Sequence, residues 1–214
     1  MISHHFDDAT LVARAAGAMS EGMSLLIDSH LYWCKECQER AWQAEQIGGQ
    51  LLDSLTPVAL SEDSLSSILA LLDDDVPVAT FKPRVSGSDE VPEPLAQLIG
   101  GDLDALPWRG MGIGVQQYDL NLGGAGACRL LRIKPGVSVP HHTHKGNELT
   151  MILRGSYSDD IGRFCKGDVA DLDDQVKHQP IVDTEQECIC LIATDAPLQF
   201  TGIMGRLAQP FIGL

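Results

Sequence analysis

The stretch that decides how this chain is organised is His30-Leu31-Tyr32-Trp33-Cys34-Lys35-Glu36-Cys37, which reads H-x3-C-x2-C. It lies inside a run of helical character. At about 100° per residue, Cys34 falls about 40° from His30 around a helix, and Cys37 falls about 20° away on the other side. The three side chains should therefore share one narrow stripe of a helix, which we expect to break near Cys34–Cys37.

Two thiols and an imidazole are three of the four ligands of a tetrahedral zinc site. The chain begins Met1-Ile2-Ser3-His4-His5, and one of these two histidines, on a segment folded back against the helix, would complete the site. The alternative is that the three helical residues are ordinary core residues on an apolar stripe. The coincident spacings favour zinc, and a short helical region held by a metal favours a binding module over an enzyme.

Composition and charge limit the classes of protein to consider. With 214 residues, of which 44% are hydrophobic, the chain can form one large domain or two of ordinary size. No apolar run approaches the roughly 20 residues of a membrane span, and no basic-then-apolar leader precedes the first predicted helix, so we expect a cytoplasmic protein. The net charge of -15 disfavours direct DNA binding and is compatible with a basic protein partner or with simple solubility.

The front of the chain carries four helical patterns. The first spans Asp7–Gly17, the second runs from Ser20 towards Cys34, and the third passes through Trp42–Leu52, with Gly48-Gly49 weakening its end. A capping signature, Ser61-Glu62-Asp63-Ser64, opens the fourth. The apolar positions of this fourth helix have little core of their own to face, and they are Leu65, Ile68, Leu69 and Leu72.

The amino-acid composition changes after the fourth helix. Prolines at 77, 83, 92 and 94, with Ser, Gly and mixed charges between them, indicate a linker. From Leu95 onward, short β-prone runs alternate with Gly and Asp turns and no helix is convincing, which indicates a β-sandwich or jelly-roll barrel. We therefore predict a two-domain α + β protein: a four-helix zinc-binding domain at 1–76, a linker at 77–94, and an all-β domain at 95–214.

A second cluster of histidines lies in the β region. The stretch Gly136–Gly155 reads G-x5-H-x-H-x3-E-x6-G and resembles the first signature of the cupin family. His142 and His144 have equal parity on a strand, so both face the same side, and Glu148 returns to that side after a short turn. The resemblance implies a double-stranded β-helix that binds a metal inside.

The fourth ligand of that metal should come from a neighbouring strand. His178 is the histidine that remains, and it follows Gly167-Asp168 as the histidine of the second cupin motif does, although Cys165 stands where that motif has a proline. Three imidazoles and one carboxylate do not fix the metal, because zinc, iron, manganese, nickel and copper all accept them. The alternative is a cupin barrel with metal-free histidines.

The chain has six cysteines, which in a cytoplasmic protein suggest metal or redox chemistry before structural disulfides. Cys188 and Cys190 share one face of a late strand. If that face is inward, they lie near the barrel metal and could bind it or respond to oxidants. The alternative is that both fill the core as small apolar residues.

The whole chain resembles ChrR-type anti-sigma factors, which join a zinc-binding helical domain to a cupin domain. The resemblance rests on the opening His-His pair, the H-x3-C-x2-C stretch, the core V-P-x-H-x-H-x-G-x-E-L at 139–149, and Cys188-Ile189-Cys190-Leu191. It implies that the helical domain sequesters an extracytoplasmic-function (ECF) sigma factor and that the cupin senses singlet oxygen or other oxidative stress to release it. It also implies two zinc sites, with the ligands His5, His30, Cys34 and Cys37 in the first and His142, His144, Glu148 and His178 in the second.

In such a protein the helices would wedge between the two DNA-binding domains of the sigma factor, with Leu65, Ile68, Leu69 and Leu72 as a clamp. The alternative for the fourth helix is that it packs back on the first three. The competing function is a metal-dependent, dioxygenase-like cupin enzyme with an accessory zinc module, which an open coordination position in a pocket would favour. Neither nucleic acid nor a membrane is expected as a direct partner.

Overall fold

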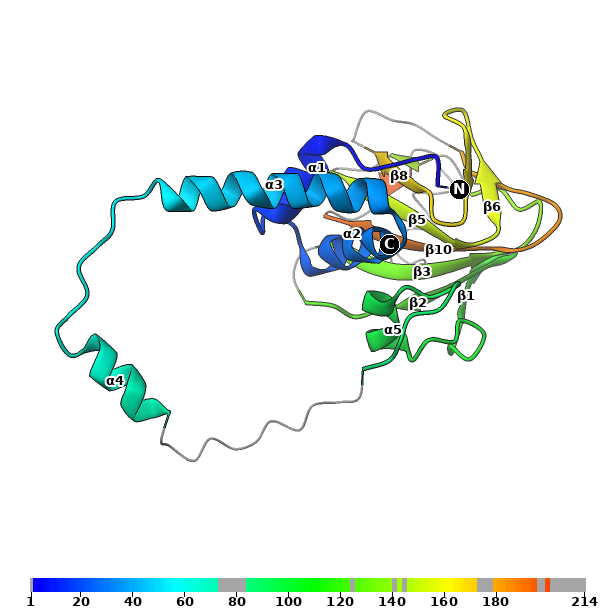
Figure 1. Ribbon diagram of the computed structural model, residues 1–214. Helices are drawn as coiled ribbons and strands as arrows, with labels where there is room; N and C mark the ends of the chain where they lie inside the picture. The colour runs from blue at the N-terminus through cyan, green and yellow to red at the C-terminus, as the bar shows by residue number, and fades with distance from the viewer. Residues whose placement is uncertain are drawn as a thin grey trace.

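The computed structural model describes residues 2–72, 84–123, 126–139, 142–143, 146–172, 179–195 and 199–200, with backbone alone for residues 142–143, 172 and 199–200. Helices from the front of the chain lie against one face of an antiparallel sheet from its second half (Figure 1). None of the helices in these ranges combines the length and the apolar character that a membrane span requires.

Five helices form within the described residues. They are α1 (Asp8–Ala15), α2 (Glu21–Trp33), α3 (Lys35–Asp53), α4 (Ser64–Leu71) and α5 (Glu93–Ile99). Side-chain caps fix the start of the first two, because the Asp7 carboxylate accepts from the Thr10 N–H and the Ser20 hydroxyl accepts from the Met23 N–H. The third runs on past Gly48 and Gly49 to Asp53.

The expected single stripe of metal ligands is interrupted at Cys34. Its backbone is extended (φ -100°, ψ 103°), so it ends α2 and at the same time is the N-cap of α3. The Cys34 sulfur accepts the Cys37 N–H, as an N-cap side chain does. The prediction that His30, Cys34 and Cys37 share one helix is therefore wrong, whereas the predicted break near Cys34–Cys37 is confirmed.

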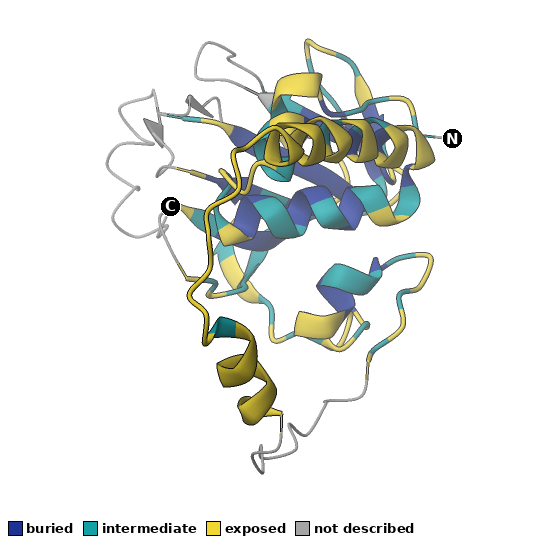
Figure 2. Ribbon diagram, turned by 60° about the vertical axis from the view of Figure 1, so that its left-hand side comes forward, coloured by how far each residue is buried: buried dark blue, intermediate teal, exposed yellow. Residues whose placement is uncertain are grey.

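The predicted four-helix module is not confirmed. Helices α1, α2 and α3 pack on one another, but α4 stands away from them in both views (Figures 1 and 2), and none of its side chains is buried. The sequence also did not predict α5, which begins with Glu93-Pro94 and ends at Gly100 in the left-handed conformation (φ 82°). This helix packs against α2.

The second half of the chain is a β-structure, as predicted. Six strands form an antiparallel sheet in the order β1-β2-β3-β10-β5-β8, a three-stranded sheet has the order β7-β6-β9, and β4 pairs with β11. The strands are β1 (Arg109–Gly112), β2 (Val115–Asp119), β3 (Ala127–Ile133), β4 (His142–Thr143), β5 (Glu148–Arg154), β6 (Ser156–Ser158), β7 (Arg163–Cys165), β8 (Val169–Leu172), β9 (Ile181–Val182), β10 (Cys188–Thr194) and β11 (Gln199–Phe200).

Both faces of the central strands β3, β10 and β5 are buried. Along β10, the side chains of Cys188 and Cys190 belong to one core cluster, which the three-stranded sheet covers, while Ile189 and Leu191 belong to the other. This other cluster includes residues of the front segment, namely Phe6, Leu11, Met23, Leu26 and Ile27, together with Val91, Leu95 and Ala96. The helices and the sheet therefore share one hydrophobic core.

The predicted domain boundaries stay a prediction, because a shared core does not decide whether the two parts can fold separately. Residues 84–94 of the predicted linker are described, and Val91 within them is only 1% exposed. The Arg154 guanidinium on β5 also binds the Glu90 carboxylate at 2.7 Å. The described end of the predicted linker is thus attached to the barrel.

Candidate metal centre

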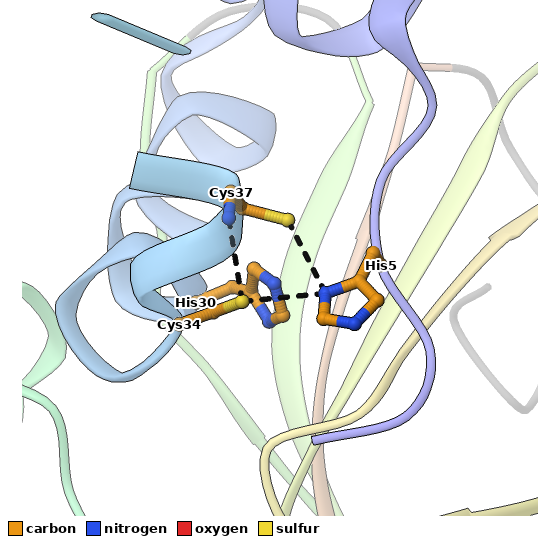
Figure 3. A group of neighbouring side chains, drawn as sticks. All are labelled: His5, His30, Cys34 and Cys37. Carbon is orange, nitrogen blue, oxygen red and sulfur yellow. Dashed lines mark hydrogen bonds between the residues drawn. The ribbon is translucent and has the colours of Figure 1, made fainter. Parts of the chain in front are cut away.

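Four side chains of the front segment meet at one point (Figure 3). His5 comes from the extended segment before α1, His30 from the last turns of α2, Cys34 from the junction and Cys37 from the first turn of α3. One ligand atom from each of the four lies within 4.8 Å of all the others, and this is the one such group of His, Cys, Asp and Glu in the described part of the chain. Two nitrogens and two sulfurs at this spacing suit tetrahedral Zn²⁺.

The structure distinguishes between the two N-terminal histidines. His5 Nδ1 lies 3.3 Å from the Cys34 sulfur and 3.6 Å from the Cys37 sulfur, so its ring faces both thiols. His4 turns the other way, and its ring lies 4.3 Å from the ring of Phe164 on β7. His5 is therefore the histidine that can complete the site.

His30 has the hydrogen-bonding pattern of a metal ligand. Its Nδ1 lies 2.9 Å from the carbonyl oxygen of Gly167, and since a carbonyl only accepts, Nδ1 must carry the proton. The lone pair is then on Nε2, which is buried and has no hydrogen-bond partner among the described residues. Burial lowers the pKa of His30 to about 4, so the ring is neutral near pH 7 and can bind a cation.

The thiols fit the same interpretation. Cys34 and Cys37 are buried, and burial, together with the neighbouring Cys34 thiol, raises the pKa of Cys37 to about 11. Without a cation the Cys37 thiol therefore keeps its proton, and a metal must displace it on binding. Four protein ligands, three of them buried, would fill a tetrahedral site and leave no open position, which is typical of a structural site and not of a catalytic one.

The segment that carries His5 is held by the barrel. We call residues 2–6 the N-terminal strap. The Asp168 carboxylate accepts the backbone N–H of Ser3 at 2.6 Å and of His4 at 3.1 Å, and its other oxygen accepts the N–H of Cys165 at 2.8 Å. Burial acts to raise the pKa of Asp168, but these backbone donors hold it below its usual range. Phe6, at the end of the strap, is buried with its ring 5.0 Å from the His30 ring.

A second feature of the front segment is its exposed apolar side chains. The residues Leu65, Ile68 and Leu69 of α4 and its C-cap Leu72 are between 51% and 74% exposed. Helix α3 is also largely exposed (Figure 2), and its exposed large apolar residues include Trp42, Ile47, Leu51 and Leu52. We call these eight residues the apolar face. The alternative in which α4 packs back on the first three helices is not the arrangement that the structure has.

Similarity to known proteins is extensive. The Anti-sigma-E factor ChrR of Cereibacter sphaeroides is 43% identical to this chain over an alignment of 214 positions, and the alignment covers 98% of each chain. The chain belongs to the ChrR family of anti-sigma factors. Residues 96–197 match the family of the ChrR Cupin-like domain. The predicted regulatory, non-enzymatic character of the chain agrees with this membership.

The fold of the ChrR family has a solved example. The crystal structure of Rhodobacter sphaeroides SigE in complex with the anti-sigma ChrR contains a chain with 42% identity and a TM-score of 0.78, and the match covers 91% of this chain and 100% of that one. The cupin-like barrel with helices before it is thus the architecture of the family, as the sequence predicted.

The predicted cupin metal site lies mostly outside the described residues. This applies to His144, His178 and the side chain of His142, whose backbone pairs with Phe200 in the β4–β11 ladder. Glu148 is described: it begins β5, its side chain is 2% exposed, and the Thr150 hydroxyl lies 3.5 Å from its carboxylate. The four-ligand cupin site therefore stays a prediction.

Cys188 and Cys190 lie in the core between the two larger sheets. Both are free and buried, and the hydrogen bond with Cys188, together with burial, raises the pKa of Cys190. They pack with Tyr157, Phe164 and Ile152, as core-filling residues do. Their redox role is an untested prediction.

Sequence reasoning missed the parts of the barrel that support the centre. Gly167 and Asp168 were noted only as the start of the second cupin motif, yet both contact the metal-binding segment more than 130 positions away in sequence. No local pattern connects residues so far apart, so only the folded chain could identify this contact.

Proposed function

We propose that this chain is an anti-sigma factor that sequesters an ECF-type sigma factor through its front helices. In this proposal His5, His30, Cys34 and Cys37 hold a zinc ion that fixes those helices. The barrel holds a second zinc through His142, His144, Glu148 and His178, and senses singlet oxygen or other oxidative stress. Cys188 and Cys190 are candidates for an oxidant-sensitive step.

The observation that carries the proposal is the apolar face. Eight large side chains on α3 and α4 are exposed to solvent, and α4 has no buried side chain to hold it in place. Exposed apolar side chains grouped on a helix mark binding surfaces in soluble proteins, and an amphipathic helix commonly binds in a groove of its partner. The related chain in the solved structure is described as ChrR in complex with SigE, which supports a sigma factor as the occupant.

Zinc would act as a cross-link. The four side chains come from the N-terminal strap, α2, and the start of α3, so one ion would join three segments. The ion supplies bonds and no reaction. Because only the folded arrangement presents all four ligands, metal binding stabilises that arrangement.

The charge of the chain suits the same partner. A sigma factor presents basic surfaces to promoter DNA, and a chain of net charge -15 would compete with the DNA for them. Direct binding of this chain to nucleic acid is disfavoured for the same reason. The proposal places the protein in the compartment of RNA polymerase, which is the cytoplasm.

The surface part of the proposal can be tested at α4. We expect the double variant Ile68→Ala/Leu69→Ala to bind the cognate sigma factor about 10-fold or more weakly, because central apolar side chains dominate binding energy. Its melting temperature should be unchanged, since both side chains are exposed in the free protein. Isothermal titration with the purified sigma factor measures the affinity.

The matched control is Ile113→Ala, which removes an equally apolar side chain at the tip between β1 and β2, where it is 97% exposed. This variant should bind with unchanged affinity. Equal affinities for the α4 double variant and the wild-type protein would refute the apolar face as the sigma-binding surface.

A further inference from the structure

One turn of the barrel reaches the candidate metal centre at two points. This turn, Cys165–Asp168, joins β7 to β8. The Gly167 carbonyl accepts a hydrogen bond from His30 Nδ1 at 2.9 Å, and the Asp168 carboxylate accepts the backbone N–H groups of Ser3 and His4, next to His5. Two of the four candidate ligands, one on α2 and one on the strap, are thus held by the same four residues of the barrel.

The contact at Gly167 fixes the ring of His30. A hydrogen bond at one imidazole nitrogen sets the tautomer and the orientation of the ring, and so directs the other nitrogen at a metal. Gly167 has a left-handed backbone (φ 89°), and a Cβ placed there would lie 2.8 Å from the Ile2 side chain. The absence of a side chain lets the strap pass directly over the turn.

The contact at Asp168 fixes the strap. Its carboxylate is buried, with the residue only 2% exposed, and it joins two backbone donors of the strap to one of its own turn. The Val169 N–H adds a hydrogen bond to the His4 carbonyl at 3.3 Å. His5 follows directly, so its position depends on a carboxylate of the barrel.

The same turn continues into the barrel interior. Asp168 is followed by β8, which pairs with β5 over its whole length, from Val169 opposite Met151 to Leu172 opposite Glu148. Glu148 is the one described side chain among the proposed cupin ligands. The two proposed metal sites are therefore connected through one short pair of strands.

We propose that the Cys165–Asp168 turn is the positioning element of the front metal site, and that through it the barrel sets the affinity of the helical segment for zinc. The Gly167 carbonyl directs His30, and the Asp168 carboxylate holds His5 in reach of the two thiols. This inference rests on the proposed zinc site. The turn would also give the barrel a path for regulation. A change in the position of β8 would move the turn, loosen the zinc site and so loosen the sigma-binding helices.

Cobalt(II) is the probe, because thiolate ligands give it a charge-transfer absorption that a site of histidine and carboxylate lacks. We expect Asp168→Asn, which replaces one acceptor oxygen by a donor facing N–H groups, to weaken cobalt binding at the thiolate site by about 10-fold to 100-fold. Ser3→Pro removes the Ser3 N–H donor without altering the turn and should act in the same direction. If both act through this contact, the double variant should bind cobalt no more weakly than the weaker single variant.

The matched control is Asp183→Asn. Asp183 is also a carboxylate of the barrel, paired with Arg163 and Ser156, but it does not contact the strap. It should leave cobalt affinity within about twofold of the wild-type value even if the melting temperature falls, which separates positioning from general destabilisation.

Two results would overturn the inference, and they differ in what else they remove. A wild-type protein without the thiolate–cobalt band would remove the zinc site of the proposed function as well. The positioning role alone would be removed if the wild-type protein shows the band and the cobalt affinities of Asp168→Asn and Ser3→Pro both lie within twofold of the wild-type affinity. If Asp168→Asn does not fold, Ser3→Pro decides by the same criterion.

Discussion

At the scale of single residues, His30 shows how the fold prepares a ligand before a metal binds. Its Nδ1 is bonded to the Gly167 carbonyl, and its Nε2 is buried without a partner in the described part of the protein. A buried polar atom left in this way costs roughly 1–3 kcal/mol. A zinc ion at Nε2 would remove that cost, which is a reason to expect tight binding.

The thiols allow the first prediction. Cys34→Ser and Cys37→Ser should each abolish stoichiometric zinc at the front site, measured by metal analysis of the purified protein, and should weaken inhibition of the sigma factor in a reconstituted transcription assay. Cys128→Ala is the control, because it removes a buried thiol outside the ligand group. Undiminished inhibition after loss of the zinc would contradict the role of zinc as a scaffold.

Gly22 supports a second prediction, about the contact between α2 and the sheet. A Cβ at Gly22 would lie 2.7 Å from the Cβ of Cys128 on β3, so Gly22→Ala must push the helix from the sheet. We expect a loss of about 1–3 kcal/mol in the free energy of unfolding, measured by urea denaturation.

Gly48→Ala is the matched control, since Gly48 is helical and exposed, and nothing lies within 4 Å of its added Cβ. It should stabilise the protein by about 0.5–1 kcal/mol, because alanine is the better helix former. Similar effects of both substitutions would show that helix propensity, and not the close contact, determines the result.

At the scale of elements, a group of charges attaches the segment around α5 to the barrel. Arg154 on β5 binds Glu90 and Glu187 at 2.7 and 3.0 Å, and Arg132 on β3 binds Glu187 at 2.8 Å. Hydrogen bonds from these arginines lower the pKa values of Glu90 and Glu187. The group therefore joins the segment just before α5 to two central strands.

The pH dependence of this group gives a third prediction. A carboxylate whose pKa is depressed by folding adds stability above its unfolded pKa, near 4.5, and that stability is lost as the pH falls through the lower folded value. The difference in urea midpoint between the wild type and Glu90→Gln/Glu187→Gln should thus be largest near pH 7 and shrink below about pH 4.5. A difference that stays constant down to pH 3 would show that the charges are not responsible.

At the scale of the whole molecule, the shared core has a consequence for the front segment. Leu26 and Ile27 on α2 are fully buried in the cluster that includes Leu149 and Ile189 of the sheet. Removing the barrel exposes them to water at a cost of about 1.5–3 kcal/mol each. If zinc binds as proposed, we expect the front helices alone to depend on it for their arrangement.

The fourth prediction follows from this dependence. A fragment of residues 1–85 should be helical and bind the sigma factor with zinc present and lose its structure on chelation, whereas the full chain should keep most of its circular dichroism signal in the same chelator. Sigma binding by the zinc-loaded fragment, without a response to oxidants, would place sensing in the barrel. A fragment that remains folded without zinc would mean that the core shared with the barrel contributes little.

Much of this organisation was predictable from local sequence. The H-x3-C-x2-C spacing predicted that His30, Cys34 and Cys37 come together, the apolar periods predicted α1 to α4 near their observed bounds, and the cupin signature predicted the barrel. Such features depend on residues close together in sequence. The missed helix α5 has a proline at its start and only seven residues, too few for a helical period to be distinct.

The sequence by itself determined which donor atoms are present, that the stretches of α1 to α4 are helical, and that the second half of the chain forms strands. Only the tertiary structure decided which of two adjacent histidines faces the thiols, that α4 stands apart from the other helices, and that a turn at 165–168 supports the front metal site. The physical reason is that His4 and His5 have the same chemistry. What distinguishes them is the Asp168 carboxylate, more than 160 residues away, which holds the strap so that His5 faces the thiols.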